Sequence, residues 1–526
     1  MDALSSTFLS TLSQHPKSLL SFNNNNYYSP NTSSFTLKVF SIGGEEPIPS
    51  PPKREPIPSR KPSFPSNIFN AFDDFVNTYI DPPRKSCVDP KYVLSDNFAP
   101  VDELPPTECK VMEGSLPSCL DGTYIRNGPN PQYLPCGPYH LFDGDGMLHS
   151  IKISQGKAMF CSRFVKTYKY YIENEADFQI IPNFNPTNGV GLANTSLALF
   201  GDKLFALDGD IITLGRHNFN GKLVRSMTAH DPKTNEAFAY RYGPFPPFLT
   251  YFRVDPNGIK TLDVPIFSIK RMNPIKFILT GGSLVGMNSR KISRLGVIPR
   301  YAKDESEMRW FDVPGFNNLH AINAWEEVGG DTIVLVAPNI LSVEHTLERM
   351  DMIHECVEKV KINLNSGVVS RHPISTRNLD FGVINPTYVG KKNKYVYAAI
   401  GYPPPKLSGI VKLDVSIAEV DRRDCIVACK IFGEGCFCGE PFFVAKNNLE
   451  ADEDDGYVML YVHSEKTGES NFLVMDATSP NLDIVANVKL PRRVPYGFHG
   501  IFVRESDLNK VCIYIYIYIY IYIYIS

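Results

Sequence analysis

The sequence predicts an all-β fold built from many short antiparallel hairpins. Apolar residues alternate over runs such as 331–337, 395–401 and 409–415, and turn residues separate the runs. The longer stretches 357–374 and 456–477 each hold two such runs around an Asn-Ser-Gly or Lys-Thr-Gly turn. Many consecutive hairpins in one long chain favour a β-propeller. A large β-sandwich is the alternative, because no clean sequence repeat distinguishes the two.

The composition is that of a globular protein with a substantial core. The chain has 526 residues, of which 43% are hydrophobic and 21% are charged. This length fits one large all-β domain or two to three ordinary domains. The net charge of −3 and the lack of Lys/Arg runs argue against a nucleic-acid partner. No uninterrupted apolar run is long enough to span a membrane.

The N-terminal region predicts three successive segments. Residues 1–44 are rich in Ser, Thr and Asn and poor in acids, which indicates a plastid transit peptide; a disordered tail is the alternative. Residues 45–65 form a Pro-rich linker. An amphipathic helix is expected over 67–80, N-capped by Ser66. We expect it to pack on the domain surface, since its acidic polar face does not suit a membrane surface.

Four cysteines lie close together in the sequence, at Cys425, Cys429, Cys436 and Cys438. Their spacings match no standard pair of zinc-binding cysteine motifs. We therefore expect reduced, partly buried thiols in an intracellular compartment.

Three histidines stand in similar apolar surroundings, at His230, His320 and His499. His320 follows a Pro-Gly turn and is flanked by Leu319 and Ala321, as expected for a side chain pointing inward from a strand end. Such a residue is either a buried core histidine or a metal ligand, and the residues alone leave both open. Histidines this far apart converge only in a fold that returns the chain repeatedly to one place.

Eight longer motifs, taken together and in this order, resemble the carotenoid cleavage dioxygenases, and most of all the plant plastid type 4 of that family. They are YIRNGPNPQ (124–132), HLFDGDGMLHSI (140–151), MTAH (227–230), RYAKDESEMRWFDVPG (300–315), HAINAWEE (320–327), NLDFGVINP (378–386), GEPFFV (439–444) and VPYGFHGIFVRESDLNK (494–510). So many ordered motifs make the resemblance specific.

The resemblance implies a seven-bladed β-propeller with a helical cap over residues 66–511, holding one non-haem Fe(II). His230, His320 and His499 match iron ligands, and no further catalytic residue is implied. Asp380 and Glu440 match carboxylates that accept the other ring N–H of ligand histidines. The implied reaction uses O₂ as cosubstrate. It cuts a C–C double bond of a carotenoid or apocarotenoid, at the 9,10 or 9′,10′ position, to carbonyl products.

The family also implies a place in the cell and roles for other histidines. We expect a plastid protein, peripheral at a membrane or plastoglobule surface. His140 and His149 lie in a family motif but match no ligand, so we interpret them as structural residues of the first blade. His345 and His354 are expected in a helix, as surface or packing residues.

The chain also departs from the family, which has four iron histidines. No histidine lies between 230 and 320, because the chain passes through 264–283 without the segment that carries the missing ligand. Further deletions are expected near 180–189 and after 204–208. We therefore predict an incomplete propeller with an impaired iron site. The alternative is a catalytically inactive carotenoid-binding propeller, or the product of a faulty gene model that does not fold.

Residues 512–526 form an aberrant tail, in which Ile and Tyr alternate strictly over 513–525. A repeated TA dinucleotide read in frame encodes this pattern. The tail is too short for a membrane span, and its β propensity predicts aggregation rather than a function.

Overall fold

The computed structural model describes the part of the chain that we expected to form the propeller. The described residues are 89–508, without 136–138, 179–191, 201–202, 209, 214–226, 232, 243–245, 258, 262, 270–290, 347–348, 418–423 and 447–451. The predicted transit peptide, linker, helix 67–80 and Ile/Tyr tail lie outside the described residues. So do 180–189 and most of 264–283, where deletions are expected.

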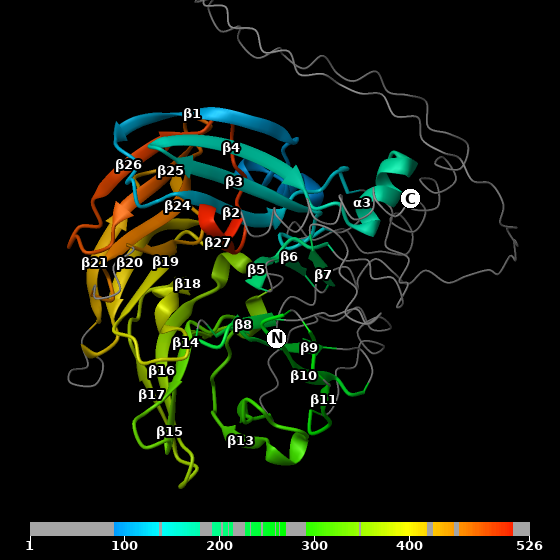
Figure 1. Cartoon of the computed structure of the whole chain (residues 1–526), viewed down its shortest axis with the longest axis vertical. Coiled ribbons are helices and arrows are strands. Elements are labelled where there is room, and N and C mark those ends of the chain that lie inside the picture. Colours follow the sequence, from blue (N-terminus) through cyan, green and yellow to red (C-terminus); the bar gives the residue numbers. More distant parts are fainter. Residues whose placement is uncertain are drawn as a thin grey trace, which may run out of the picture. The chain divides into compact units, whose positions relative to one another are not determined.

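Antiparallel strands dominate the described residues, so the predicted all-β fold is confirmed (Figure 1). The α-helices in this part of the chain are short. The helical elements are α2 (Pro90–Val93), α3 (Tyr168–Ala176) and the 3₁₀ turns η3 (Asp96–Phe98), η4 (Glu305–Glu307), η5 (Val343–His345), η6 (Met350–Met352) and η7 (Pro386–Tyr388). The helical cap stays a prediction, because helix 67–80 is outside the described residues.

The first antiparallel unit combines strands from both ends of the described chain (Figure 1). The order β27–β2–β3–β4–β1 runs through β27 (Gly500–Arg504), β2 (Gly122–Pro129), β3 (Gly146–Ser154), β4 (Lys157–Phe164) and β1 (Leu104–Gly114). Strand β1 also pairs on its other side with β26 of the last unit. The pairing of β27 with β2 joins the two ends of the described chain in one sheet.

Six further units follow in chain order. They are β5 (Ser196–Phe200), β6 (Lys203–Asp208), β7 (Asp210–Thr213); β8 (Met227–His230), β9 (Ala237–Tyr242), β10 (Leu249–Val254), β11 (Val264–Ile266); β12 (Arg294–Val297), β13 (Arg309–Asp312); β14 (Asn323–Glu326), β15 (Thr332–Ile340), β16 (Glu355–Asn363), β17 (Val369–Pro373); β18 (Leu379–Val383), β19 (Tyr395–Gly401), β20 (Leu407–Asp414), β21 (Ile426–Ile431); and β22 (Cys436–Cys438), β23 (Phe442–Ala445), β24 (Gly456–Ser464), β25 (Glu469–Asp476), β26 (Ile484–Lys489). The predicted hairpins of 357–374 and 456–477 are β16–β17 and β24–β25.

Each hydrophobic cluster joins two consecutive units. Along β24, for example, Met459 and Tyr461 pack toward the first unit, whereas Val458 and Leu460 pack toward β19 and β20. Because successive side chains of a strand point to opposite faces, both faces of β24 are buried. This explains why the run YVMLYV is almost continuously apolar rather than alternating.

The helix predicted around His345 and His354 is wrong. Strands β15 and β16 remain paired up to Ile340 and Glu355. The connection between them reverses the chain, and its described residues include the separate 3₁₀ turns η5 and η6. His354 is half-buried at the end of this connection, and its Nε2 lies 3.1 Å from the Thr376 carbonyl oxygen.

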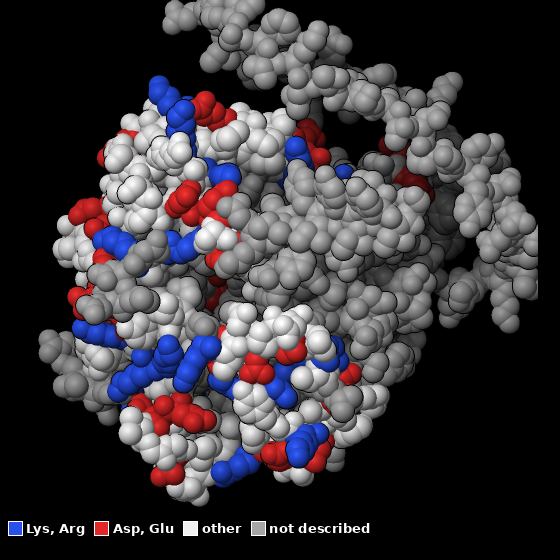
Figure 2. Space-filling model, in the orientation of Figure 1, with Lys and Arg blue, Asp and Glu red and all other residues white. Residues whose placement is uncertain are grey.

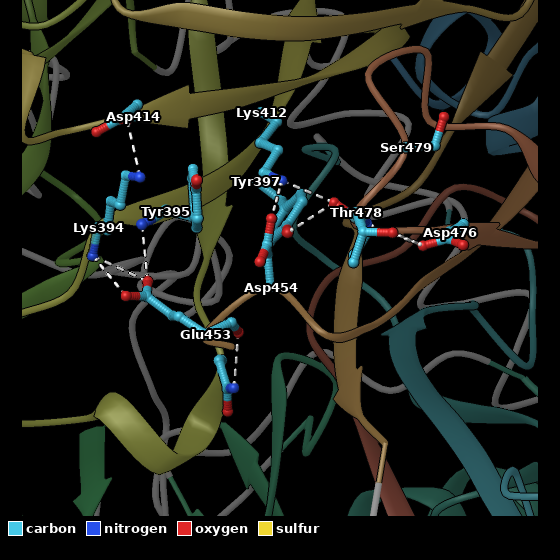
Figure 3. A network of polar contacts seen from close by, with 12 residues as sticks. Lys394, Tyr395, Tyr397, Lys412, Asp414, Glu453, Asp454, Asp476, Thr478 and Ser479 are labelled. Atoms are coloured by element: carbon cyan, nitrogen blue, oxygen red, sulfur yellow. Dashed lines mark hydrogen bonds and ion pairs between the residues drawn. The ribbon is translucent and has the colours of Figure 1, made fainter. Parts of the chain in front are cut away.

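A buried polar network ties β19 and β20 to the loop that precedes β24 (Figure 3). The ammonium group of Lys412 pairs with Asp454 at 2.5 Å and donates to the Ala477 carbonyl at 2.8 Å. Next to Asp454, the Glu453 carboxylate accepts the backbone N–H groups of Lys394 and Tyr395. Lys412 is 5% exposed, so its charge depends on the Asp454 carboxylate.

Replacing Asp454 by Ala should lower the stability of the protein by about 3–5 kcal/mol, because it leaves the Lys412 charge buried without its partner. Thermal unfolding measures the loss. Asp452→Ala, which removes an exposed carboxylate of the same loop, is the control and should change little. Lys412→Met added to Asp454→Ala should recover part of the stability; no recovery would contradict this account of the network.

Candidate metal centre

His320 lies in the segment between β13 and β14, three residues before β14 begins. It is therefore not at a strand end, as the sequence suggested, but in an irregular segment held by its neighbours. The backbone of Asn317 donates to the Asn339 side chain at 2.8 Å and accepts the Ile340 N–H at 2.6 Å. This fixes the segment against the end of β15. The imidazole Nδ1 lies 2.8 and 3.0 Å from the two carboxylate oxygens of Asp380 on β18.

His499 directly precedes β27 and has the same kind of carboxylate support. Its Nδ1 lies 2.8 Å from Oε1 of Glu440, whose Oε2 accepts the Gly500 N–H at 3.1 Å. Backbone hydrogen bonds to Asn127 and Thr195 fix the His499 backbone at the end of β2. Glu440 is 7% exposed, in the connection between β22 and β23.

The two imidazole rings meet edge to face. Their centroids are 5.2 Å apart and the ring planes cross at 87°. Phe381 lies beside both rings, with centroid distances of 5.2 Å to His320 and 5.9 Å to His499. Its backbone is left-handed, with φ of 52°, which costs energy for a residue other than glycine. The regular pairing of β18 with β19 is therefore interrupted directly after Asp380.

The ring nitrogens of His320 and His499 divide their roles in the same way. A carboxylate that accepts a hydrogen bond from Nδ1–H fixes the tautomer and leaves the lone pair on Nε2. Among the described residues, Nε2 of neither ring makes a hydrogen bond. Two imidazoles oriented by carboxylates, each with its Nε2 deprotonated, are a donor set that suits Fe(II). The residues present therefore fit the metal that the sequence implies.

Electrostatic interactions at His320 are strong. Burial alone would lower the pKa of His320, but the Asp380 carboxylate outweighs burial and raises it to about 9. Burial alone would raise the pKa of Asp380, but the His320 ring holds it below its ordinary value. Burial also raises the pKa of Glu355 well above the ordinary range, and the charge of Asp380 raises it further. Glu355 was not predicted at this site, since in the sequence it only begins an ordinary strand.

Arg126 lies close to Glu440 and was also missed: a Cβ atom on the neighbouring Gly439 would be 3.1 Å from a guanidinium nitrogen of Arg126. Its side chain is fully buried, and its guanidinium group stacks over the Tyr461 ring at 5.0 Å. One guanidinium nitrogen donates to the Pro495 carbonyl. Burial lowers the pKa of Arg126, and the Glu440 carboxylate is among the groups that oppose that effect. The motif YIRNGPNPQ contained this residue, but nothing in its pattern distinguished a buried cation from a surface one.

The third predicted ligand, His230, is the last residue of β8, and its side chain lies outside the described part. Within the described residues, no group of three His, Cys, Asp or Glu side chains is arranged to hold a metal ion. His320 and His499 are therefore a partial ligand set.

His140 and His149 are buried in and beside the first unit. The four clustered cysteines form no disulfide among the described residues, and Cys425 and Cys438 are buried.

The antiparallel units and the paired, carboxylate-supported histidines define a candidate metalloenzyme of the β-propeller class. The model of the family described as retinal pigment epithelial membrane protein matches residues 98–504, and the chain belongs to this family, which includes the carotenoid cleavage dioxygenases. The predicted propeller fold is confirmed by the crystal structure of the Pseudomonas brassicacearum lignostilbene dioxygenase. That structure has a TM-score of 0.69 and 20% identity, and the match covers 81% of this chain and 100% of that one.

Two plant relatives are much closer in sequence. The probable carotenoid cleavage dioxygenase 4, chloroplastic, of Arabidopsis thaliana is 56% identical over 533 positions, covering 88% of this chain and 89% of the relative. The 9-cis-epoxycarotenoid dioxygenase NCED1, chloroplastic, of Oryza sativa subsp. japonica is 51% identical over 518 positions, covering 85% and 81%. Because 88% of 526 residues is about 463, about 70 of the 533 aligned positions hold no residue of this chain. This agrees with the expected internal deletions.

The interaction between His320 and Asp380 should make the stability of the metal-free protein depend on pH. The pKa of His320 is raised from 6.5 to about 9, so its contribution is fully present below about pH 6.5 and is lost as the pH rises through 9. His320→Gln should therefore lower the thermal midpoint in chelator clearly at about pH 6 and much less at about pH 9.5. His372→Gln, at an exposed position, is the control. An equal loss at both pH values would contradict the assignment.

Proposed function

We propose that this chain is a plastid non-haem iron dioxygenase by descent, which cleaves a C–C double bond of a carotenoid or apocarotenoid to two carbonyl products. The observation that carries the proposal is the pair of carboxylate-supported imidazoles, in a chain similar to chloroplastic carotenoid dioxygenases over most of its length. Cleavage at the 9,10 or 9′,10′ bond is the position that we propose for it.

In this proposal His230, His320 and His499 hold the iron through their imidazoles. Asp380 and Glu440 keep each Nδ1 protonated and turn Nε2 toward the metal. When bound, Fe(II) supplies the redox chemistry that lets O₂ react with a polyene double bond. Phe381, packed on both rings, restricts how far either imidazole can rotate.

The missing segment between 230 and 320 favours a second candidate, a propeller that binds carotenoid without cleaving it. A site with one ligand fewer loses a metal–nitrogen bond and the strand that held the other ligands in register. We therefore expect an impaired enzyme. The two candidates differ in iron content and in product formation.

The protein is proposed to work in plastids, with residues 1–44 as transit peptide, 45–65 as linker and 66–511 as the propeller domain. Among the described residues, no helix is long and apolar enough to cross a membrane. On the face shown in Figure 2, Lys and Arg side chains are interspersed with Asp and Glu. This mixture on the visible face supports an uncharged partner over nucleic acid. We propose a peripheral location at a plastid membrane or plastoglobule.

The purified full chain should contain less than one iron per molecule and form little apocarotenal from a carotenoid in detergent micelles. Members of the family carry a His-Asp-Phe segment and a following strand where this chain passes through 264–283. Restoring both there should raise the iron content and the product yield, whereas a histidine alone should not. His499→Ala should lower the iron content further, and His372→Ala should leave it unchanged. Stoichiometric iron with rapid cleavage in the unmodified chain would contradict the impaired site. Iron-free protein that binds carotenoid would support the second candidate.

A reporter protein fused behind residues 1–44 should enter plastids in plant cells, because this segment is poor in acids and rich in hydroxyl side chains. Fluorescence microscopy gives the location. A matched fusion that begins at residue 45 should stay in the cytosol. A cytosolic reporter with residues 1–44 in place would rule out the transit peptide.

A further inference from the structure

The turn between β8 and β9 carries a carboxylate at each of its ends. Asp231 directly follows His230, the last residue of β8, and Glu236 directly precedes β9. The backbone N–H of Asp231 donates to the Glu236 carbonyl at 2.9 Å, and His230 is paired with Ala237 in the register of the two strands. A contact that holds these two carboxylates therefore also holds the backbone of His230.

Each carboxylate uses one oxygen within its own unit and the other toward a neighbouring segment. Oδ1 of Asp231 accepts a backbone N–H of the turn at 2.8 Å, and Oδ2 pairs with the Arg300 guanidinium group. Oε1 of Glu236 pairs with Arg253 on β10 at 3.0 Å, and Oε2 accepts a hydrogen bond from the Tyr301 hydroxyl at 2.8 Å. Two consecutive residues, Arg300 and Tyr301, thus contact both ends of the turn.

Further contacts with β9 and β10 fix this pair of residues. The Arg300 guanidinium group lies over the Phe238 ring, 4.8 Å from its centroid, and that of Arg253 lies over the Tyr301 ring at 4.5 Å. The Tyr251 hydroxyl donates to the Arg300 carbonyl at 2.7 Å. The Arg300 side chain is 46% exposed, so its ion pair alone would hold the turn weakly. The several contacts together give the pair a defined position.

Arg300 and Tyr301 lie in the connection between β12 and β13, which is also fixed to β11. The Glu305 carboxylate of the same connection accepts the two consecutive backbone N–H groups that directly follow β11, at 2.6 Å each. From β13 the chain continues into the segment of His320. The connection therefore links the unit that carries His230 to the strand that leads to His320.

We propose that Arg300 and Tyr301 are positioning residues that hold the β8–β9 hairpin, and so set the backbone of His230 relative to His320 for metal binding. Metal ligands must be held within about 0.5 Å of their productive geometry, so a hairpin that moves would weaken the site. The inference rests on the proposed role of His230 as a metal ligand. It gives the start of the motif RYAKDESEMRWFDVPG a function at the metal centre.

The test uses the double variant Arg300→Met/Tyr301→Phe, which removes both contacts and keeps most of the side-chain volume. Co²⁺ binding to the full chain is followed by its visible absorption. The double variant should weaken Co²⁺ binding by roughly tenfold or more. In a His230→Ala background the same two substitutions should cause no further loss. The control is Lys466→Met, which removes an exposed ion pair of another unit and should leave Co²⁺ binding unchanged.

A second measurement needs no metal. Hydrogen exchange of the backbone amides of 227–242, followed by mass spectrometry, should be several times faster in the double variant, whereas exchange in β24 and β25 should not change. Unchanged exchange in 227–242 overturns the inference, as does wild-type Co²⁺ affinity in the double variant or an equal loss of affinity without His230. A wild-type chain that binds no Co²⁺, or binds it equally well without His230, overturns the proposed metal ligand instead. Exchange then separately supports or overturns the anchoring of the hairpin.

Discussion

The pairing of β27 with β2 is the contact on which the rest of the structure depends. It joins the C-terminal strand to the N-terminal sheet, and it places His499, the residue before β27, against the end of β2. The approach is close: a Cβ atom on Gly500 would lie 2.6 Å from the Tyr124 hydroxyl, and one on Gly128 would lie 2.8 Å from the Gly497 Cα. Side chains at these glycines would separate the strands. The same contact therefore joins the two ends of the described chain and sets the position of one candidate ligand, His499.

The candidate site repeats one local arrangement on two unrelated segments. In each, a histidine from an irregular segment before a strand directs Nδ1 to a carboxylate from a neighbouring unit. Each carboxylate also interacts with a backbone N–H group, that of Gly500 for Glu440 and that of Phe381 for Asp380. The buried cation Arg126 adds positive charge near Glu440 alone. The two histidines are consequently supported by different electrostatic surroundings, although their geometry is alike.

Much of the fold was predictable because the strands carry strong local signals. Runs such as 395–401 and 456–477 became strands with little change in their bounds, since both faces are buried between neighbouring units. The partners of His320 and His499 came from the family resemblance, because residues sixty positions apart show no pattern of their own. Glu355 and Arg126 could not be predicted, since burial of a charged residue depends on tertiary packing. The helix expected near His345 was wrong for the same reason. The pairing of β15 with β16 makes this segment a connection between two strands, with 3₁₀ turns instead of a helix.

The central claim is that His320 and His499 bind one metal ion through nitrogen atoms whose opposite ring positions are held by carboxylates. X-ray absorption spectroscopy of the iron-loaded chain tests it most directly, because scattering from the outer atoms of an imidazole ring distinguishes histidine from oxygen ligands. We predict imidazole scattering that decreases by one ligand in His320→Ala and again in His499→Ala. A spectrum with oxygen ligands alone, or one that neither substitution changes, would contradict the account.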